Sequence, residues 1–206
     1  MEMVNMKNIL SKLKSNKGLT LVEVLAAMAI FSVLSVSIIT LFTTSVNTQS
    51  SILQNQQLLN ESGHVVEYMH RAIRMAARDD APVGTGACAG AGVNYLINAG
   101  EDEIIFLGYD NVVEDYVCMK FNLASGKIKI YKSTDSSSAN FDAGQELTSS
   151  QVLVDVLKFD ISGQTPGADQ PKVAVMIHMK SNSKRVSPIP EITLQTTASQ
   201  RNLNVP

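Results

Sequence analysis

The most informative absences in this sequence concern proline and charge near the N-terminus. No proline occurs between Leu19 and Ala81, and residues 19–42 contain one charged side chain, that of Glu23. Such a 24-residue apolar run, if helical, spans roughly 36 Å, which is enough to cross the hydrocarbon core of a bilayer with some tilt. A secretory signal peptide is the alternative, but its apolar region would be shorter and followed by a small-residue cleavage site.

Cysteine is scarce, and motifs of catalysis are absent. Cys88 and Cys118 form no CxxC pair and have no histidine at zinc-binding spacing. The three histidines, His64, His70 and His178, are scattered, and the sequence contains no HExxH motif, nucleophile elbow or GxGxxG loop. We therefore expect no enzyme activity, no catalytic residue, no metal site and no cofactor.

Charge is unevenly distributed along the chain, although the net charge is only −2. Residues 1–18 contain four lysines and one acid, as the positive-inside rule expects of a cytoplasmic flank. The remaining 13 basic and 18 acidic residues give a formal charge of −5, which suits an exported domain. If this domain is exported, we expect a disulfide between Cys88 and Cys118, and the alternative is two free or buried thiols.

Clusters of charged residues raise two further classes of ligand, calcium and DNA. Acids at residues 79–80, 101–103 and 110–115 leave calcium open, but no EF-hand spacing occurs and solvated surface acids are the usual explanation. Three arginines share one helix face and could contact DNA, but ordinary surface ion pairs are the more common role for such residues: Arg71, Arg74 and Arg78. We therefore expect no nucleic acid as a partner.

Helical periodicity continues beyond the apolar run. Apolar residues recur at helical spacing on one face, at Ile52, Leu59, Val66, Met69, Ile73, Ala76 and Ala77. Polar and charged residues occupy the other face, at Gln54, Glu61, Glu67, Arg71, Arg74 and Arg78. The pattern predicts one helix of about 60 residues that ends near Asp79–Pro82, because Pro82 disfavours helix at the residue before it.

The rest of the chain alternates with a period of two residues, which is typical of strands. The predicted strands are Glu103–Tyr109, Val112–Asn122, Lys127–Lys132, Val152–Ile161, Lys172–Lys180 and Glu191–Ser199. Asn122–Gly126 predicts a hairpin turn between two of them. An antiparallel sheet covered on one face by the amphipathic helix gives an α+β fold. The predicted organisation is a leader at 1–18, an apolar helix at 19–42, its amphipathic continuation at 43–80 and a β-rich head at 81–206.

The junction between leader and apolar helix reads Lys17-Gly18-Leu19-Thr20-Leu21-Val22-Glu23. A glycine at the boundary allows the backbone to enter a protease site in extended form. An acid one turn inside an apolar helix should cost a few kcal/mol when it is unpaired. If the chain is cut after Gly18, Glu23 could pair with the free amine of Leu19 in a neighbouring subunit, and the alternative is a carboxylate that favours the helix dipole or snorkels.

These junction residues resemble the class III signal of type IV pilins and type II secretion pseudopilins. The resemblance implies cleavage between Gly18 and Leu19 by the membrane prepilin peptidase, N-methylation of Leu19 and an assembly salt bridge of Glu23. It also implies a single-pass protein of the inner membrane with an extracytoplasmic head, and membrane lipid, an assembly platform and other pilins as partners. The new terminus is usually Phe in the family, so Leu19 is a departure that concerns the efficiency of methylation.

A further resemblance concerns the subtype. Residues 67–76 and 194–202 are similar to segments of the larger minor pilins, in particular the J-type minor pseudopilin and the W-type minor pilin. In that family such subunits form a tip complex that primes assembly. The apolar segment also lacks the helix-kinking proline of many fibre-forming pilins. The alternatives are a singly anchored extracytoplasmic adhesin and a DNA-uptake pilin.

Overall fold

The computed structural model describes residues 18–80, 87–90, 92–133, 137–164, 170–183 and 188–201. The predicted leader up to residue 17 lies outside the described residues, as does Pro82. The chain divides into two compact units, Met1–Thr48 and Gln49–Pro206, and each is described by itself. The first unit contributes the apolar part of a helix, and the second contains the head.

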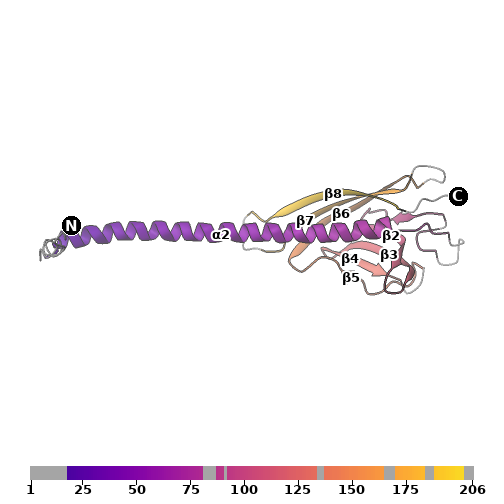
Figure 1. Cartoon of the computed structure of the whole chain (residues 1–206), viewed down its shortest axis with the longest axis horizontal. Coiled ribbons are helices and arrows are strands. Elements are labelled where there is room, and N and C mark those ends of the chain that lie inside the picture. The colour runs from indigo at the N-terminus through magenta and orange to yellow at the C-terminus, as the bar shows by residue number, and fades with distance from the viewer. Residues whose placement is uncertain are drawn as a thin grey trace, which may run out of the picture. The chain divides into compact units, whose positions relative to one another are not determined.

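The helix α2 (Leu21–Arg74) has 54 residues (Figure 1). It ends about one turn before the predicted region Asp79–Pro82, so that prediction was wrong. The reason is tertiary, because the chain beyond Arg74 leaves the helix to pair with the head. Ala77 forms an isolated antiparallel bridge with Leu107, and Asp79 forms another with Val93.

The head contains two antiparallel sheets, as an α+β fold requires. The first has the strand order β1 (Tyr95–Ile97), β2 (Glu103–Asp110), β3 (Asp115–Ala124), β4 (Lys127–Lys132) and β5 (Gln145–Glu146). The second has the order β6 (Val152–Ser162), β7 (Lys172–Ser181) and β8 (Glu191–Ser199). In the view of Figure 1, β8 lies above the C-terminal part of α2, and β4 and β5 lie below it.

All six predicted strands are present: Lys127–Lys132 and Glu191–Ser199 have the predicted bounds, and the other four differ at one or both ends. The strand predicted to begin at Val112 begins at Asp115, because residues 111–114 form the turn between β2 and β3. The predicted hairpin turn is a two-residue turn, since Ala124 pairs with Lys127. Ser125 and Gly126 both have positive φ, at 54° and 71°, which is the backbone of a type I′ turn.

The core of the head is shared by α2 and both sheets. The helix buries a stripe at steps of three and four residues, consisting of Leu58, Ser62, Val65, Met69 and Ile73. The predicted face was therefore wrong in its first half, because Ile52 and Leu59 are exposed at 50% and 55%. Where two apolar residues are adjacent, as at Leu58-Leu59, the spacing fits either of two buried faces of the helix. Packing against the sheets decides which face is buried.

The C-terminal end of α2 is closed by groups from distant parts of the chain. The Tyr95 hydroxyl donates to the carbonyl of Ile73 at 2.8 Å, and the backbone N–H of Arg201 donates to the carbonyl of Arg74 at 2.9 Å. The side chain of Gln200, 1% exposed, donates to the carbonyl of Ala76 and accepts from Asn94. These contacts satisfy carbonyls that a helix end leaves without an intrahelical partner.

Replacement of Gln200 by Ala should lower the free energy of unfolding by about 2–3 kcal/mol, because it deprives a buried carbonyl of its donor and leaves a cavity. Urea unfolding followed by the near-ultraviolet circular dichroism of the tyrosines measures this loss. Gln195→Ala, an exposed glutamine on β8, is the matched control. Equal losses in the two variants would contradict the role given to Gln200.

A buried carboxylate organises the turn between β2 and β3. Asp110 is 5% exposed and accepts hydrogen bonds from Lys132 Nζ at 2.7 Å and from the Val112 backbone N–H at 2.8 Å. The hydrogen bond from Lys132 is the main reason that the pKa of Asp110 lies below its usual value, with the bond from Val112 second. The folded state therefore favours the ionised carboxylate.

Stability should depend on pH through this group. The pKa of an aspartate in an unfolded chain is about 3.9. The stabilisation by Asp110 is therefore present above that pH and is lost as the pH falls through the lower pKa of the folded state. The Asp110→Asn variant should have a free energy of unfolding about 1–3 kcal/mol lower than that of wild type at pH 7. The difference between variant and wild type in urea unfolding should narrow below about pH 4. A difference that stays constant from pH 7 to pH 3 would contradict this assignment.

Candidate functional site

The N-terminal end of α2 is built as a capping box. Thr20 precedes the first helical residue, and its Oγ1 accepts a hydrogen bond from the Glu23 backbone N–H at 3.3 Å. In return Glu23 Oε2 accepts from the Thr20 backbone N–H and from its hydroxyl, both at 3.4 Å. The pattern Thr-x-x-Glu satisfies two N–H groups that the first turn leaves free, and Glu23 also lies at the positive end of the helix dipole.

Thr20 is the functional residue that the sequence analysis missed. Its signal was present, because threonine followed three residues later by glutamate at the start of an apolar run is a helix-start pattern. The box fixes where the helix begins, and it leaves Gly18 and Leu19 outside the helix.

The predicted cleavage residues are accessible. Gly18 is exposed, and a Cβ added to it would meet no other atom within 4 Å. Leu19 is 75% exposed. Leu19 and Glu23 also line one shallow hollow of about 310 Å³, together with Val24, Ala27, Met28 and Phe31. The residue expected to carry the new terminus and the acidic side chain are therefore neighbours on one side of the helix end.

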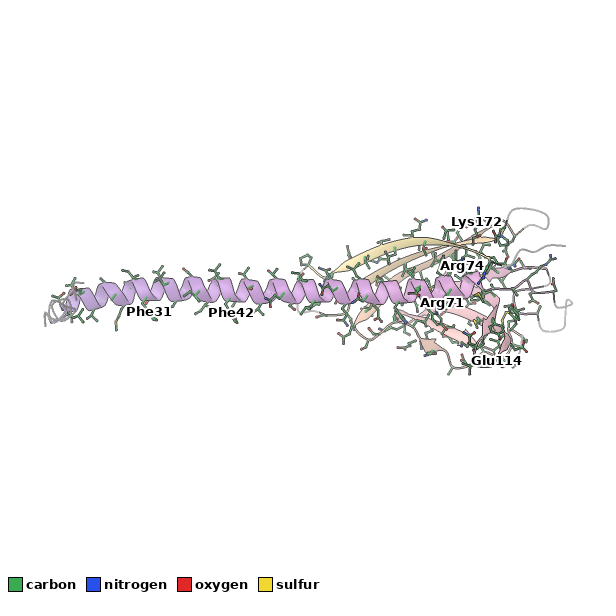
Figure 2. All side chains as sticks on the ribbon, in the orientation of Figure 1. Phe31, Phe42, Arg71, Arg74, Glu114 and Lys172 are labelled. Carbon is green, nitrogen blue, oxygen red and sulfur yellow. A yellow bond between two sulfur atoms is a disulfide. The ribbon has the colours of Figure 1, made fainter. Side chains whose placement is uncertain are left out.

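The apolar part of α2 exposes large hydrophobic side chains along its length. Examples are Leu25 at 58%, Phe31 at 72% and Phe42 at 68%, and the two phenylalanines are labelled in Figure 2. By length and composition this helix can cross a membrane. Exposed apolar surface of this extent requires lipid or other helices around it.

The hydroxyl side chains of this apolar stretch bond to their own helix. Ser32, Ser37 and Thr40 donate to the carbonyls four residues earlier, at 2.7, 2.9 and 2.8 Å. Thr44 and Thr48 do the same. Because these five hydroxyls are satisfied within the helix, the residues are compatible with an environment that offers no water.

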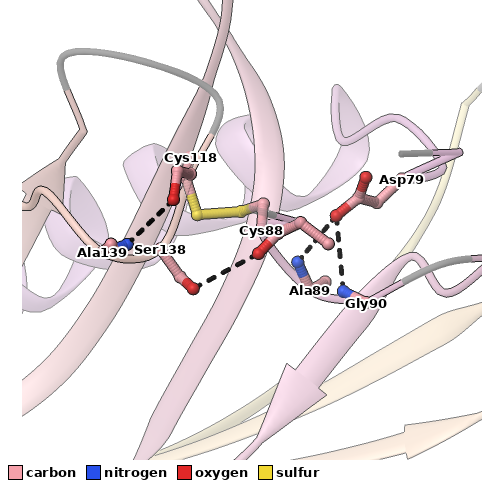
Figure 3. Close-up of a disulfide and its surroundings, with 9 residues drawn as sticks. Asp79, Cys88, Ala89, Gly90, Cys118, Ser138 and Ala139 are labelled. Atoms are coloured by element: carbon pink, nitrogen blue, oxygen red, sulfur yellow. Dashed lines mark hydrogen bonds between the residues drawn. A yellow bond between two sulfur atoms is a disulfide. The ribbon is translucent and has the colours of Figure 1, made fainter. Parts of the chain in front are cut away.

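A disulfide between Cys88 and Cys118 joins the segment after α2 to strand β3, with Cα atoms 5.4 Å apart (Figure 3). Both cysteines are buried, at 2% and 0% exposure. Next to the bond, the Asp79 carboxylate accepts from the backbone N–H groups of Ala89 and Gly90 at 3.0 and 3.3 Å. The segment carrying Cys88 is thus held by a covalent bond and by hydrogen bonds.

The histidines and acids do not form a metal centre within the described part of the chain, where no group of three or more metal-ligating side chains is found. His178 Nδ1 lies 3.7 Å from Asp155 and Nε2 lies 3.8 Å from Glu191, and Asp155 also pairs with Lys180 at 2.7 Å. His64 and His70 lie on α2. The arrangement on β7 is a surface network of charges.

Comparison with known proteins gives one match, and it covers the junction. The family described as the prokaryotic N-terminal methylation motif matches residues 13–39. No curated protein and no solved structure matches the chain. The match covers Gly18, Leu19, the capping box and most of the apolar helix, so the chain carries a prepilin-type signal. Together with one apolar helix and a β-rich head, this signal supports a pilin-like protein anchored by a single span.

Proposed function

We propose that the chain is made as a membrane-inserted precursor, is cut between Gly18 and Leu19, and then serves as a structural subunit of a pilus-like filament. The observation that carries this proposal is the methylation motif placed on an exposed junction directly before a membrane-length apolar helix. The prepilin peptidase would act on Gly18–Leu19 at the cytoplasmic side, and Leu19 would be N-methylated. The head would then lie outside the cytoplasm, where a disulfide is stable.

Glu23 couples processing to assembly in this proposal. Among the described residues of the single chain, its carboxylate has only the long capping contacts with Thr20. Cleavage would create an amine on Leu19, and a neighbouring subunit could present that amine to Glu23 within a bundle of apolar helices. An unpaired charge is costly there and a paired one is not, so the pair favours docking in register.

The narrower assignment is to a minor subunit in a tip-initiating complex, of the J-type pseudopilin or W-type pilin kind. It is supported by the similarity of residues 67–76 and 194–202 to the larger minor pilins, and by the proline-free apolar segment. Its partners would be the other minor subunits, the major pilin and the inner-membrane assembly platform. A minor subunit would occur in fewer copies per filament than the major one, which quantitative mass spectrometry of filaments measures.

Mass spectrometry of the chain isolated from cells with an active prepilin peptidase tests the proposal. The expected N-terminus is Leu19 carrying one methyl group. Gly18→Val should leave the leader attached, because a branched side chain next to the cleaved bond fills the space that glycine leaves free for the protease. Ser15→Val, within the leader but away from the bond, is the control. An intact residue 1–18 leader in the wild-type protein would overturn the cleavage claim.

A further inference from the structure

A basic hollow lies beside the C-terminal end of α2. It measures about 310 Å³ and is lined by Glu67, His70, Arg71, Arg74, Met75 and Arg201, and we refer to it as the arginine hollow. Three arginines against one glutamate give a formal charge of +2, in a chain whose net charge is −2. Figure 2 labels Arg71 and Arg74 near the end of the helix. The hollow is therefore a positively charged site on a protein whose net charge is negative.

The guanidinium groups of the arginine hollow are not used to cap the helix. Arginines in a last turn often bond to the final carbonyls, but here those carbonyls accept from the Tyr95 hydroxyl, the Gln200 side chain and the Arg201 backbone N–H. Arg71 pairs with Glu67 at 2.8 Å, and both side chains are about three-quarters exposed, so this pair contributes little. Within the described residues, Arg74 and Arg201 make no ion pair.

A second unexplained feature is the turn between β2 and β3, which we define as the hairpin tip (residues 111–115). Val112 and Val113 are 88% and 61% exposed. Glu114 has a positive φ of 57°, and Glu114 and Asp115 are exposed and make no ion pair within the described residues. Because Asp110 binds Lys132 and the Val112 N–H, the tip is held in shape and presents two carboxylates and two valines outward.

The two features are complementary in charge and in chemistry. The tip carries a formal charge of −2 against the +2 of the arginine hollow. Arginine forks match carboxylates in bidentate geometry, and the side chain of Met75, 40% exposed, offers apolar surface for the valines. Figure 2 shows Arg74 and Glu114 at separate places on the head.

We propose that the hairpin tip of one copy of this chain docks into the arginine hollow of a neighbouring copy. The contact uses two different surfaces of each copy, so it is heterologous and can repeat along a helical filament. It rests on the proposed function as a filament subunit, and it adds a contact between heads to the contacts between apolar helices. It requires at least two copies to be neighbours, so it belongs to the broader proposal of a filament subunit and not to the narrower assignment to a tip complex.

Cross-linking tests the contact in full-length chains. Two differently tagged copies, one Met75→Cys and one Val113→Cys, are produced together with the prepilin peptidase. A disulfide-linked dimer carrying both tags is expected. The native cysteines are buried, so they should not exchange with the new ones. Lys172→Cys, an exposed position on β7, replaces Met75→Cys in the control and should give no dimer above background.

Charge reversal makes the test specific. Arg71→Glu with Arg74→Glu in the hollow-bearing copy should lower the cross-linked fraction about tenfold, because attraction becomes repulsion. Glu114→Arg with Asp115→Arg in the other copy should restore it. The proposal is overturned if the cross-linked fraction is no higher than in the Lys172→Cys control, or if charge reversal does not change it. If the chains are cleaved and incorporated while no dimer forms, only this contact fails; if cleavage and incorporation also fail, the proposed function fails with it.

Discussion

Glu23→Gln is expected to leave the chain inserted and cleaved but to exclude it from filaments. Glutamine keeps the capping box, because its carbonyl oxygen can accept the same hydrogen bonds from Thr20, whereas it cannot pair with an amine as an ion. A broken pair in an apolar bundle leaves an uncompensated charge and costs about 3–5 kcal/mol, which corresponds to a hundredfold loss of incorporation or more, roughly. Immunoblots of membrane and sheared-filament fractions measure the two populations.

Glu23→Asp and Thr20→Val separate the two roles of this end of the helix. Glu23→Asp keeps the charge on a shorter side chain and should retain part of the incorporation. Thr20→Val removes the hydroxyl that accepts from the Glu23 N–H but leaves the carboxylate, so its loss should be smaller, of about 1 kcal/mol. If Glu23→Gln enters filaments as well as wild type, Glu23 serves only as a cap.

Loss of the disulfide is expected to have the largest effect on the stability of the head. The bond joins residues 30 apart, and in the chain-entropy model a loop of this size stabilises by about 3–4 kcal/mol. The double variant Cys88→Ala/Cys118→Ala should lose this stabilisation without leaving a buried thiol or hydroxyl unpaired. Chemical unfolding of the detergent-solubilised chain, followed by tyrosine circular dichroism, measures the shift.

The matched comparison is wild-type protein unfolded and refolded in a reductant. Its unfolding should approach that of the double variant, whereas the variant itself should not respond to the reductant. Oxidised wild-type protein should contain no titratable thiol after denaturation, since the described residues contain no free cysteine. If oxidised wild-type protein had the same unfolding midpoint as the double variant, the bond would not stabilise the head.

Most of the local structure could be predicted from the sequence because it depends on neighbouring residues. Strand periodicity found the six longer strands, and only the short strands β1 and β5 were missed. These two have three and two residues, too few to show an alternating pattern. The methylation motif and the apolar helix could be recognised for the same reason, because their signals lie within about 30 consecutive residues.

The division of the strands into two sheets could not be predicted in this way. The first five strands and the last three have similar alternation, and the boundary between the sheets lies between β5 and β6 because these two strands do not pair with each other. The capping box, in contrast, could be predicted from the sequence, because Thr20 and Glu23 lie three residues apart within the recognised motif.

The sequence by itself determined the junction at Gly18–Leu19, the membrane-length apolar run, the acid within it and the strand-rich character of the head. Each depends on the composition or spacing of consecutive residues, which is local information. The tertiary structure alone decided that Leu58 rather than Leu59 faces the core, that α2 ends at Arg74, and that the distant Arg201 joins the end of α2 in the arginine hollow. These depend on contacts between residues far apart in sequence, whose free energy outweighs the small differences in local propensity.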